Sequence, residues 1–121
     1  MMSELGENEY REDDIEYSQD LIALFNGVPV TGTVIAFDSD GRKESSEEYR
    51  RGIRHGVSRE YYPNGNVSEE HHYRMGVHEG PIREYYENGR MKSEEIRHLG
   101  EVSSHRSWSP DGTELHSEAD K

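Results

Sequence analysis

The longest apolar stretch of the chain is DLIALFNGVPVTGTVIAFDSDG, from Asp20 to Gly41. Its alternation of apolar with polar or small residues, and its β-branched content, predict strands at about 20–25 and 31–38. No segment keeps apolar residues at three- and four-residue spacing, and Gly or Pro falls every few positions. The pattern therefore favours strands over helices.

A seven-residue sequence occurs twice, as REYYPNG from Arg59 and as REYYENG from Arg83. Aligning the chain on the glycine of this sequence gives four glycines, separated by 24, 24 and 23 positions, each preceded by Asp or Asn. Such pairs are typical of a type I turn closed by a glycine bulge. The predicted turn residues are Asp40, Gly41, Asn64, Gly65, Asn88, Gly89, Asp111 and Gly112.

One unit of this repeat is long enough for one hairpin, since a turn and two strands of ordinary length occupy about 24 residues. The sequence thus predicts an all-β fold: a single-layer antiparallel β-meander of about four 24-residue hairpin repeats, in which neighbours in sequence are neighbours in space. The expected strands are 20–25, 31–38, 42–50, 55–62, 66–74, 80–86, 90–98, 103–108 and 112–117.

Composition limits the size of the core and shows an uneven charge. The 121 residues are 30% hydrophobic with a mean hydropathy of -1.13, which is thin for a two-layer core but fits one domain. The formal net charge is -12, and residues 1–20 hold eight acids against Arg11 alone. We expect a disordered acidic arm at 1–18, a repeat domain at 19–117 and a tail at 118–121.

Sites for chemistry are hard to find in this sequence. The chain has no Cys, and it has neither a Gly-x-Ser-x-Gly elbow nor the glycine-lysine pattern of a phosphate loop. His71 and His72 invite a metal site, but adjacent residues of a strand point to opposite faces. His55 and His78 are interpreted as polar loop residues. We therefore predict no catalytic residues, no metal site, no cofactor and no enzymatic activity.

The side chains that recur on one predicted face are of the kind enriched at binding hot spots. Because residues two apart share a face of a strand, Arg59 and Tyr61 lie together, and Arg83 and Tyr85 repeat the arrangement. The alternative is that these rings are simply the packing of a sheet that has little else to bury. The candidate partner-binding residues are Phe37, Arg59, Tyr61, Arg83, Tyr85 and Trp108.

The segment HGVSREYYPNGNVSEEHHYRMGVHEGPIREYYENGRMKSEE, from His55 to Glu95, resembles the MORN-repeat variant of bacterial YwqK-type antitoxin proteins. The matching frame consists of a glycine, a YY-x-NG turn, SEE in the return strand, and a Tyr such as Tyr49 or Tyr73. The chain departs from it at Arg97, which replaces that Tyr, and at Ser104, which replaces a spacer glycine.

The resemblance implies a non-catalytic protein-binding module, an antitoxin or immunity protein that neutralises a cognate toxin by covering its surface. The acidic arm would favour a toxin with a basic surface and repel nucleic acid. The alternative is a MORN-type scaffold or membrane-associated adaptor.

The sequence also leads to predictions of the cellular location and the oligomeric state. It has no apolar run of about 18 residues and begins with acidic rather than basic residues, which predicts a cytoplasmic protein without membrane insertion. We expect a monomer. The alternative is a dimer paired at an edge strand, with the apolar strand at Leu21–Phe25 as its seam.

Overall fold

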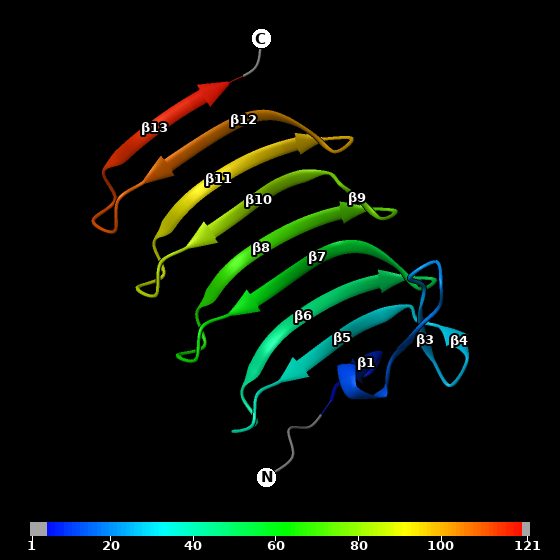
Figure 1. The fold of residues 1–121 in the computed structure, drawn as a ribbon. Helices are drawn as coiled ribbons and strands as arrows, with labels where there is room; N and C mark the ends of the chain where they lie inside the picture. The colour runs from blue at the N-terminus through cyan, green and yellow to red at the C-terminus, as the bar shows by residue number, and fades with distance from the viewer. Residues whose placement is uncertain (1–4, 120–121) are drawn as a thin grey trace.

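The computed structural model describes residues 5–119, which form a long, curved, single-layer sheet with a smaller sheet at its N-terminal end (Figure 1). The main sheet is an antiparallel meander from its second strand onward, so the predicted all-β hairpin architecture is confirmed. In spatial order its strands are β1 (Glu9–Arg11), β5 (Gly32–Phe37), β6 (Lys43–Arg50), β7 (Ile53–Tyr61), β8 (Val67–Arg74), β10 (Gly80–Tyr85), β11 (Met91–His98), β12 (Glu101–Trp108) and β13 (Glu114–Ala119), with β9 (Val77–His78) also paired to β8.

Cross-strand register defines the two faces of the main sheet, because directly paired residues point to the same side. We call the side that carries Arg59 and Tyr61 the aromatic face, and the side that carries Ser58 and Glu60 the pocket face. On the aromatic face, successive pairs join Ser46, Arg59, Glu70, Arg83, Glu94, Arg106 and Ser117 in one row. On the pocket face, they join Ser45, Glu60, Glu69, Glu84, Ser93, Ser107 and His116.

The four Asp-Gly and Asn-Gly turns lie at one margin of the sheet. Each glycine has a positive φ between 81° and 93°, and its N–H donates to the carbonyl three residues earlier. That earlier residue in turn donates its own N–H to the residue after the glycine, which is the arrangement of a type I turn closed by a glycine bulge. The ladder register shifts at the aromatic residue before each turn, at Phe37, Tyr61, Tyr85 and Trp108.

Hydrogen bonds between consecutive turns explain why the YY-x-NG sequence is repeated. The Tyr62 hydroxyl donates to the Tyr85 carbonyl at 2.6 Å, and the Tyr86 hydroxyl donates to the Trp108 carbonyl at 2.7 Å. The Asn64 amide donates to the Glu87 carbonyl, and one hairpin later the Asn88 amide donates to the Pro110 carbonyl. The second Tyr and the Asn of the motif thus fix each turn against the next.

Two-residue turns at the opposite margin join β6 to β7, β8 to β9 and β11 to β12. In each of them a non-glycine residue and the following glycine both have positive φ, as a type I′ turn requires. The predicted strands leave connections at these positions, but the type I′ geometry was not predicted, because the first residue lacks the usual Asn or Asp. We call this row the turn margin: Arg51-Gly52, Met75-Gly76 and Leu99-Gly100.

The backbone of the turn margin is also held by the preceding hairpin. The N–H of Gly76 donates to the Arg54 carbonyl at 2.8 Å, and the N–H of Met75 donates to Nδ1 of His55 at 3.0 Å. The equivalent groups of Leu99 and Gly100 donate to Glu79 Oε2 and to a backbone carbonyl. Both margins are therefore completed only when neighbouring hairpins are present.

Residues 9–30 form an N-terminal cap over the first hairpin. The cap contains β1, a single 3-10 turn (Glu12–Asp14) and a three-stranded sheet of β2 (Glu16–Tyr17), β3 (Ala23–Phe25) and β4 (Val28–Pro29). It buries Ile15, Ala23 and Val30 against Val34 and Tyr49 of the main sheet. This cluster is the core of the protein, and it lies on the pocket face of β5 and β6.

The cap corrects the expectation that residues 1–18 are disordered, although residues 1–4 lie outside the described residues. Few apolar residues suffice for order here, because β5 and β6 already present an apolar surface that Ile15 can cover. The first edge of the main sheet is β1, which pairs with β5 in parallel, an orientation that was not predicted. The proposed seam at Leu21–Phe25 is wrong as an edge of the main sheet, because β3 lies inside the small sheet and Ala23 is fully buried.

The far end of the sheet also differs from the expected boundaries. β13 extends to Ala119, so the predicted tail at 118–121 begins inside a strand, and residues 120–121 lie outside the described residues. No helix of the described part is long and apolar enough to cross a membrane.

Two glycine substitutions distinguish the cost of a side chain at positive φ from the cost of a steric clash with the cap. Gly65→Ala should cost about 1 kcal/mol through the positive φ alone, since no atom lies within 4 Å of the added Cβ. Gly52→Ala should cost clearly more, because its Cβ would overlap Cγ2 of Ile22 in the cap. Urea unfolding measures both variants, and equal costs would show that the cap does not pack on this turn.

A second prediction concerns the buried side chain of Ile15 in the cap. Ile15→Ala should lower the free energy of unfolding by about 2 kcal/mol or more, the usual cost of truncating a buried aliphatic residue. Val28→Ala in the same cap is the control, because Val28 is exposed and should change stability little. A neutral result for Ile15→Ala would contradict the ordered cap.

Candidate protein-binding surface

The predicted arginines lie in a row of alternating charge on the aromatic face. Arg59 Nε is 4.0 Å from Glu70 Oε1, and Arg83 NH1 is 3.7 Å from Glu70 Oε2. On its other side, the Arg83 Nε donates to Glu94 Oε2 at 2.9 Å. The row of Arg59, Glu70, Arg83, Glu94 and Arg106 therefore neutralises most of its own charge.

Burial in this row is matched by contacts between opposite charges. The Glu70 side chain is mostly buried, so its two arginine neighbours supply the charge that a buried carboxylate requires. The hydrogen bond to Glu94 raises the pKa of Arg83, and burial raises the pKa of Tyr85 beside it. The row is thus an array of guanidinium and carboxylate groups that contact one another across neighbouring strands.

The predicted aromatic residues line the same face next to the Asn-Gly turns. Phe37, Tyr61, Tyr85 and Trp108 are all partly buried, and each is the last residue of its strand. Cations lie over three of the rings: Arg11 over Phe37, Lys43 over Tyr61, and Arg106 over Trp108, at 4.9, 5.7 and 5.0 Å from the ring centroids. The structure therefore brings all six candidate residues to one face.

Acidic residues face one another on the opposite side of the same strands. Glu69 is paired with Glu60 on one side and with Glu84 on the other, so three carboxylates are adjacent. The hydrogen bond from Glu60 to Glu69 raises the pKa of Glu60 and lowers that of Glu69, so the two groups share a proton as the pH falls. The two faces of the sheet thus differ in charge.

The histidines that suggested a metal site are separated by the pleat of the sheet. The register of β8 places His71 on the pocket face and His72 on the aromatic face, as predicted. His71 Nδ1 lies 3.1 Å from Nε2 of His78, and its Nε2 lies 3.0 Å from Glu69. Burial and the charge of His71 lower the pKa of His78. Within residues 5–119, no group of three or more His, Asp or Glu side chains is arranged to hold a metal ion.

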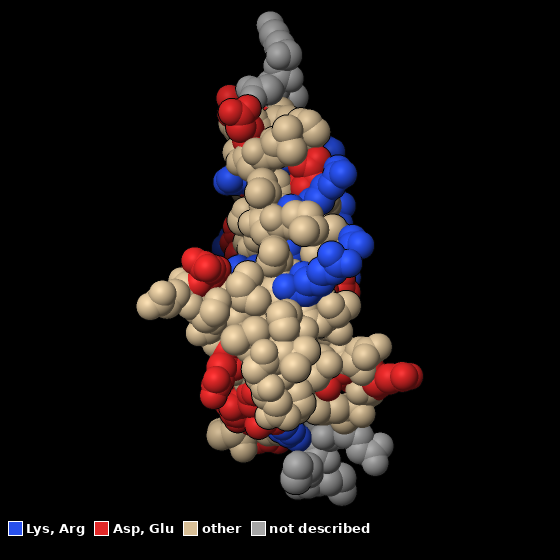
Figure 2. Space-filling model, turned by 90° about the vertical axis from the view of Figure 1, so that its right-hand side faces the viewer, with Lys and Arg blue, Asp and Glu red and all other residues tan. Residues whose placement is uncertain are grey.

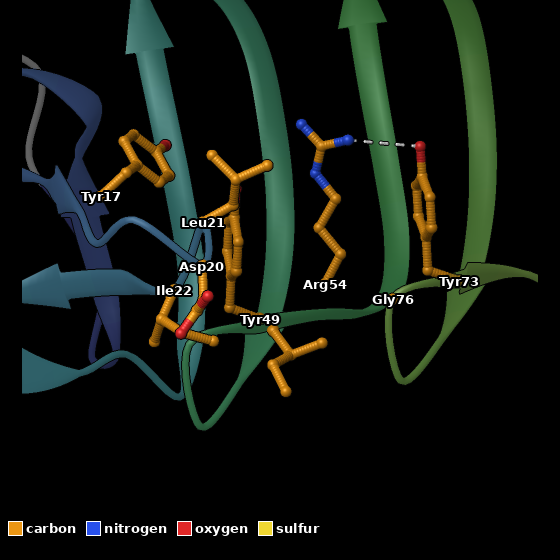
Figure 3. Close-up of a pocket in the computed structure, with 9 residues that line it drawn as sticks. Tyr17, Asp20, Leu21, Ile22, Tyr49, Arg54, Tyr73 and Gly76 are labelled. Carbon is orange, nitrogen blue, oxygen red and sulfur yellow. Dashed lines mark hydrogen bonds between the residues drawn. The ribbon is translucent and has the colours of Figure 1, made fainter.

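A pocket of about 600 Å³ opens where the cap ends on the pocket face (Figure 3). Tyr17 and Leu21 of the cap lie on one side of it, and Tyr49, Arg54 and Tyr73 of the sheet lie on the other. The Tyr49 hydroxyl donates to Glu47, and burial raises the pKa of Tyr49, which keeps the phenol protonated.

Arg54 occupies one wall of this pocket in a fixed position. It is paired with Glu47 at 2.9 Å, its NH1 donates to the Tyr73 hydroxyl, and its guanidinium lies over the Tyr73 ring. The arrangement offers apolar and aromatic surface with one oriented cation. Sequence reasoning missed the pocket because half of its wall comes from the cap, and the only available signal was the recurrence of Tyr49 and Tyr73 at 24 residues.

The chain matches one family model, the MORN repeat variant, over residues 54–75 and 79–96. The match covers β7 with β8 and then β10 with most of β11, which are the central hairpins of the sheet. No curated protein matches the chain. The two central hairpins of the chain are therefore similar to the MORN repeat variant.

The paired carboxylates lead to a pH prediction. Because the pKa of Glu60 is raised in the folded protein, stability falls as the pH rises from the ordinary value of 4.5 through the folded pKa. Glu60→Gln keeps a donor toward Glu69 but removes the repulsion, so it should stabilise the protein at pH 7 by a few tenths of a kcal/mol, about the usual size of like-charge cross-strand terms.

The gain from Glu60→Gln should disappear at acidic pH, once Glu60 itself is protonated and no longer repels Glu69. Glu101→Gln, at the opposite margin, controls for the general effect of removing one acid from a chain of net charge -12. Thermal unfolding across this pH range measures both variants. A gain for Glu60→Gln that equals the control at every pH would contradict the shared proton.

Proposed function

We propose that this protein is a non-catalytic protein-binding module that uses its aromatic face to cover the surface of a partner protein. The observation that carries the proposal is the row of Tyr, Trp and Arg side chains on one face of a single-layer sheet. These residue types dominate binding hot spots because they combine apolar area with hydrogen-bonding groups.

The hydrogen-bonded arrangement of this face supports the proposal energetically. Arg83 is held by Glu94 and Glu70, and the strand that carries Tyr85 is fixed by the hydrogen bond from Tyr62 to its carbonyl. Side chains that are already ordered lose less conformational entropy when a partner binds. An extended, ordered array of this kind suits a broad protein surface better than a small molecule.

We further propose that the partner is a bacterial toxin and that the protein acts as its antitoxin or immunity protein. The MORN-type repeats support the protein-binding part of this proposal. Binding would neutralise the toxin by excluding its substrate, so no chemistry by this chain is needed. The surplus of acidic side chains favours a toxin with a basic surface.

The experiment is co-expression of the protein with the product of the neighbouring gene. The wild-type protein should restore growth and co-purify with that product. The double variant Tyr61→Thr/Tyr85→Thr, in which Thr retains a high strand propensity, should weaken the complex by about a hundredfold, at about tenfold for each lost hot-spot ring. Isothermal titration calorimetry measures the affinity.

Glu84→Thr is the matched control, since Glu84 precedes Tyr85 on β10 but lies on the pocket face. It should bind within about twofold of the wild type. If the wild-type protein neither rescues growth nor co-purifies, the antitoxin role is wrong. If rescue survives the double variant, the aromatic face is not the binding surface.

A further inference from the structure

The turn margin carries two apolar side chains where the backbone disfavours them. Met75 and Leu99 have φ of 49° and 50°, a region that bulky residues rarely occupy. The equivalent position in the cap is Asn26, with φ of 50°, which is the residue type that such turns prefer. Strained residues of this kind are most often retained where they serve a function.

Most of the exposed apolar surface gathers at the same margin. Leu21 is 76% exposed, Leu99 69% and Met75 53%, although each could have been polar at no cost in packing. The large apolar residues that are exposed at or beside these turns are Leu21, Met75, Val77, Leu99 and Val102. Among the other exposed ones in the described part, Tyr17 and Val28 lie in the cap and Leu115 lies on β13.

Hydrogen bonds hold these side chains in fixed positions. The N–H of Leu99 donates to Glu79 Oε2 at 2.6 Å, and this bond lowers the pKa of Glu79. The N–H of Met75 is held by His55 in the same way. The two side chains therefore project from rigid turns rather than from mobile loops, which reduces the entropy that a partner must overcome.

The margin is richer in arginine than the chain as a whole. The turns and their flanking residues, 50–54, 74–79 and 97–101, contain five arginines and two acids, and two of the arginines, Arg54 and Arg97, pair with Glu47 and Glu95 outside these ranges. Arg50 and Arg51 are exposed and form no ion pair with any described residue. Figure 2 views this margin and shows uncharged surface along its middle, with Lys and Arg gathered on one side of the upper half.

The spacing of the margin defines the shape that fits it. Successive turns are two strands apart, which is about 10 Å. Residues seven positions apart on one face of an α-helix are about 10.5 Å apart. A helix that lies along the margin can therefore place one side chain between each pair of projecting residues, with acidic residues toward the arginines.

The pocket in Figure 3 supplies the site for the first of these side chains. It lies between Leu21 at its mouth and Gly76, the neighbour of Met75, in its wall. A second side chain would lie between Met75 and Leu99. We propose that the turn margin docks an amphipathic helix of a partner protein, with apolar residues seven positions apart and acidic residues beside them. This surface is separate from the aromatic face and does not depend on the function proposed for that face.

A labelled synthetic helix of about 20 residues, with two leucines seven positions apart and glutamates beside them, tests the proposal by fluorescence anisotropy. The full-length protein should bind it at least about tenfold more tightly than an isomeric helix whose leucines lie on opposite faces. The variant Met75→Asn/Leu99→Asn should lose this preference but should melt at a higher temperature, because Asn accepts a positive φ.

Leu115→Asn is the control, since Leu115 is exposed on β13 away from the margin, and it should leave the affinity unchanged. Equal binding of the two helices, or binding that survives Met75→Asn/Leu99→Asn, overturns the proposal. Vesicles of phosphatidylcholine and phosphatidylglycerol form a second arm. Sedimentation with these vesicles that requires Met75 and Leu99, without binding of the helix, would assign the margin to a lipid surface and would also overturn the proposal.

Discussion

Hydrogen bonding between neighbouring hairpins is the constraint on which the rest of this structure depends. The sheet has one layer, and its core lies under the cap at one end, so most strands have no second layer to pack against. Away from the cap, each strand is held by the ladder on both sides and by the turns of its neighbours at both margins. A turn such as Met75-Gly76 satisfies its N–H groups only through the preceding hairpin, which couples the stability of consecutive units.

Much of this fold follows from the sequence because the glycine turns set the register. Because Gly65 and Gly89 occupy equivalent positions, Arg59 aligns with Arg83 and Tyr61 aligns with Tyr85. Side chains two residues apart point to the same face of a strand, so all four lie on one face of the sheet. The aromatic face could therefore be predicted residue by residue. The strands that follow the first hairpin lie within about two residues of their expected ends.

The ordered cap and the backbone geometry of the turn margin could not be predicted, for two different physical reasons. The cap is acidic, and composition alone does not show that Tyr10 and Ile15 meet an apolar surface already prepared by β5. The turns at Met75 and Leu99 carry no turn sequence, because hydrogen bonds from other hairpins stabilise a conformation that local preference disfavours. The pocket combines both features, since its walls come from the cap and from strands far along the chain.

The parallel strand β1 gives the sheet two unlike ends. Only three residues of β1 pair with the outer edge of β5, and they do so in parallel, whereas all later neighbours are antiparallel. No described strand pairs with the outer edge of β13. The two ends of the described sheet therefore present different edges, a short parallel strand at the first hairpin and the six-residue strand β13 at the last. Each hairpin added beyond β13 would lengthen the sheet by about 10 Å without disturbing the cap, which makes molecular length an adjustable property of this architecture.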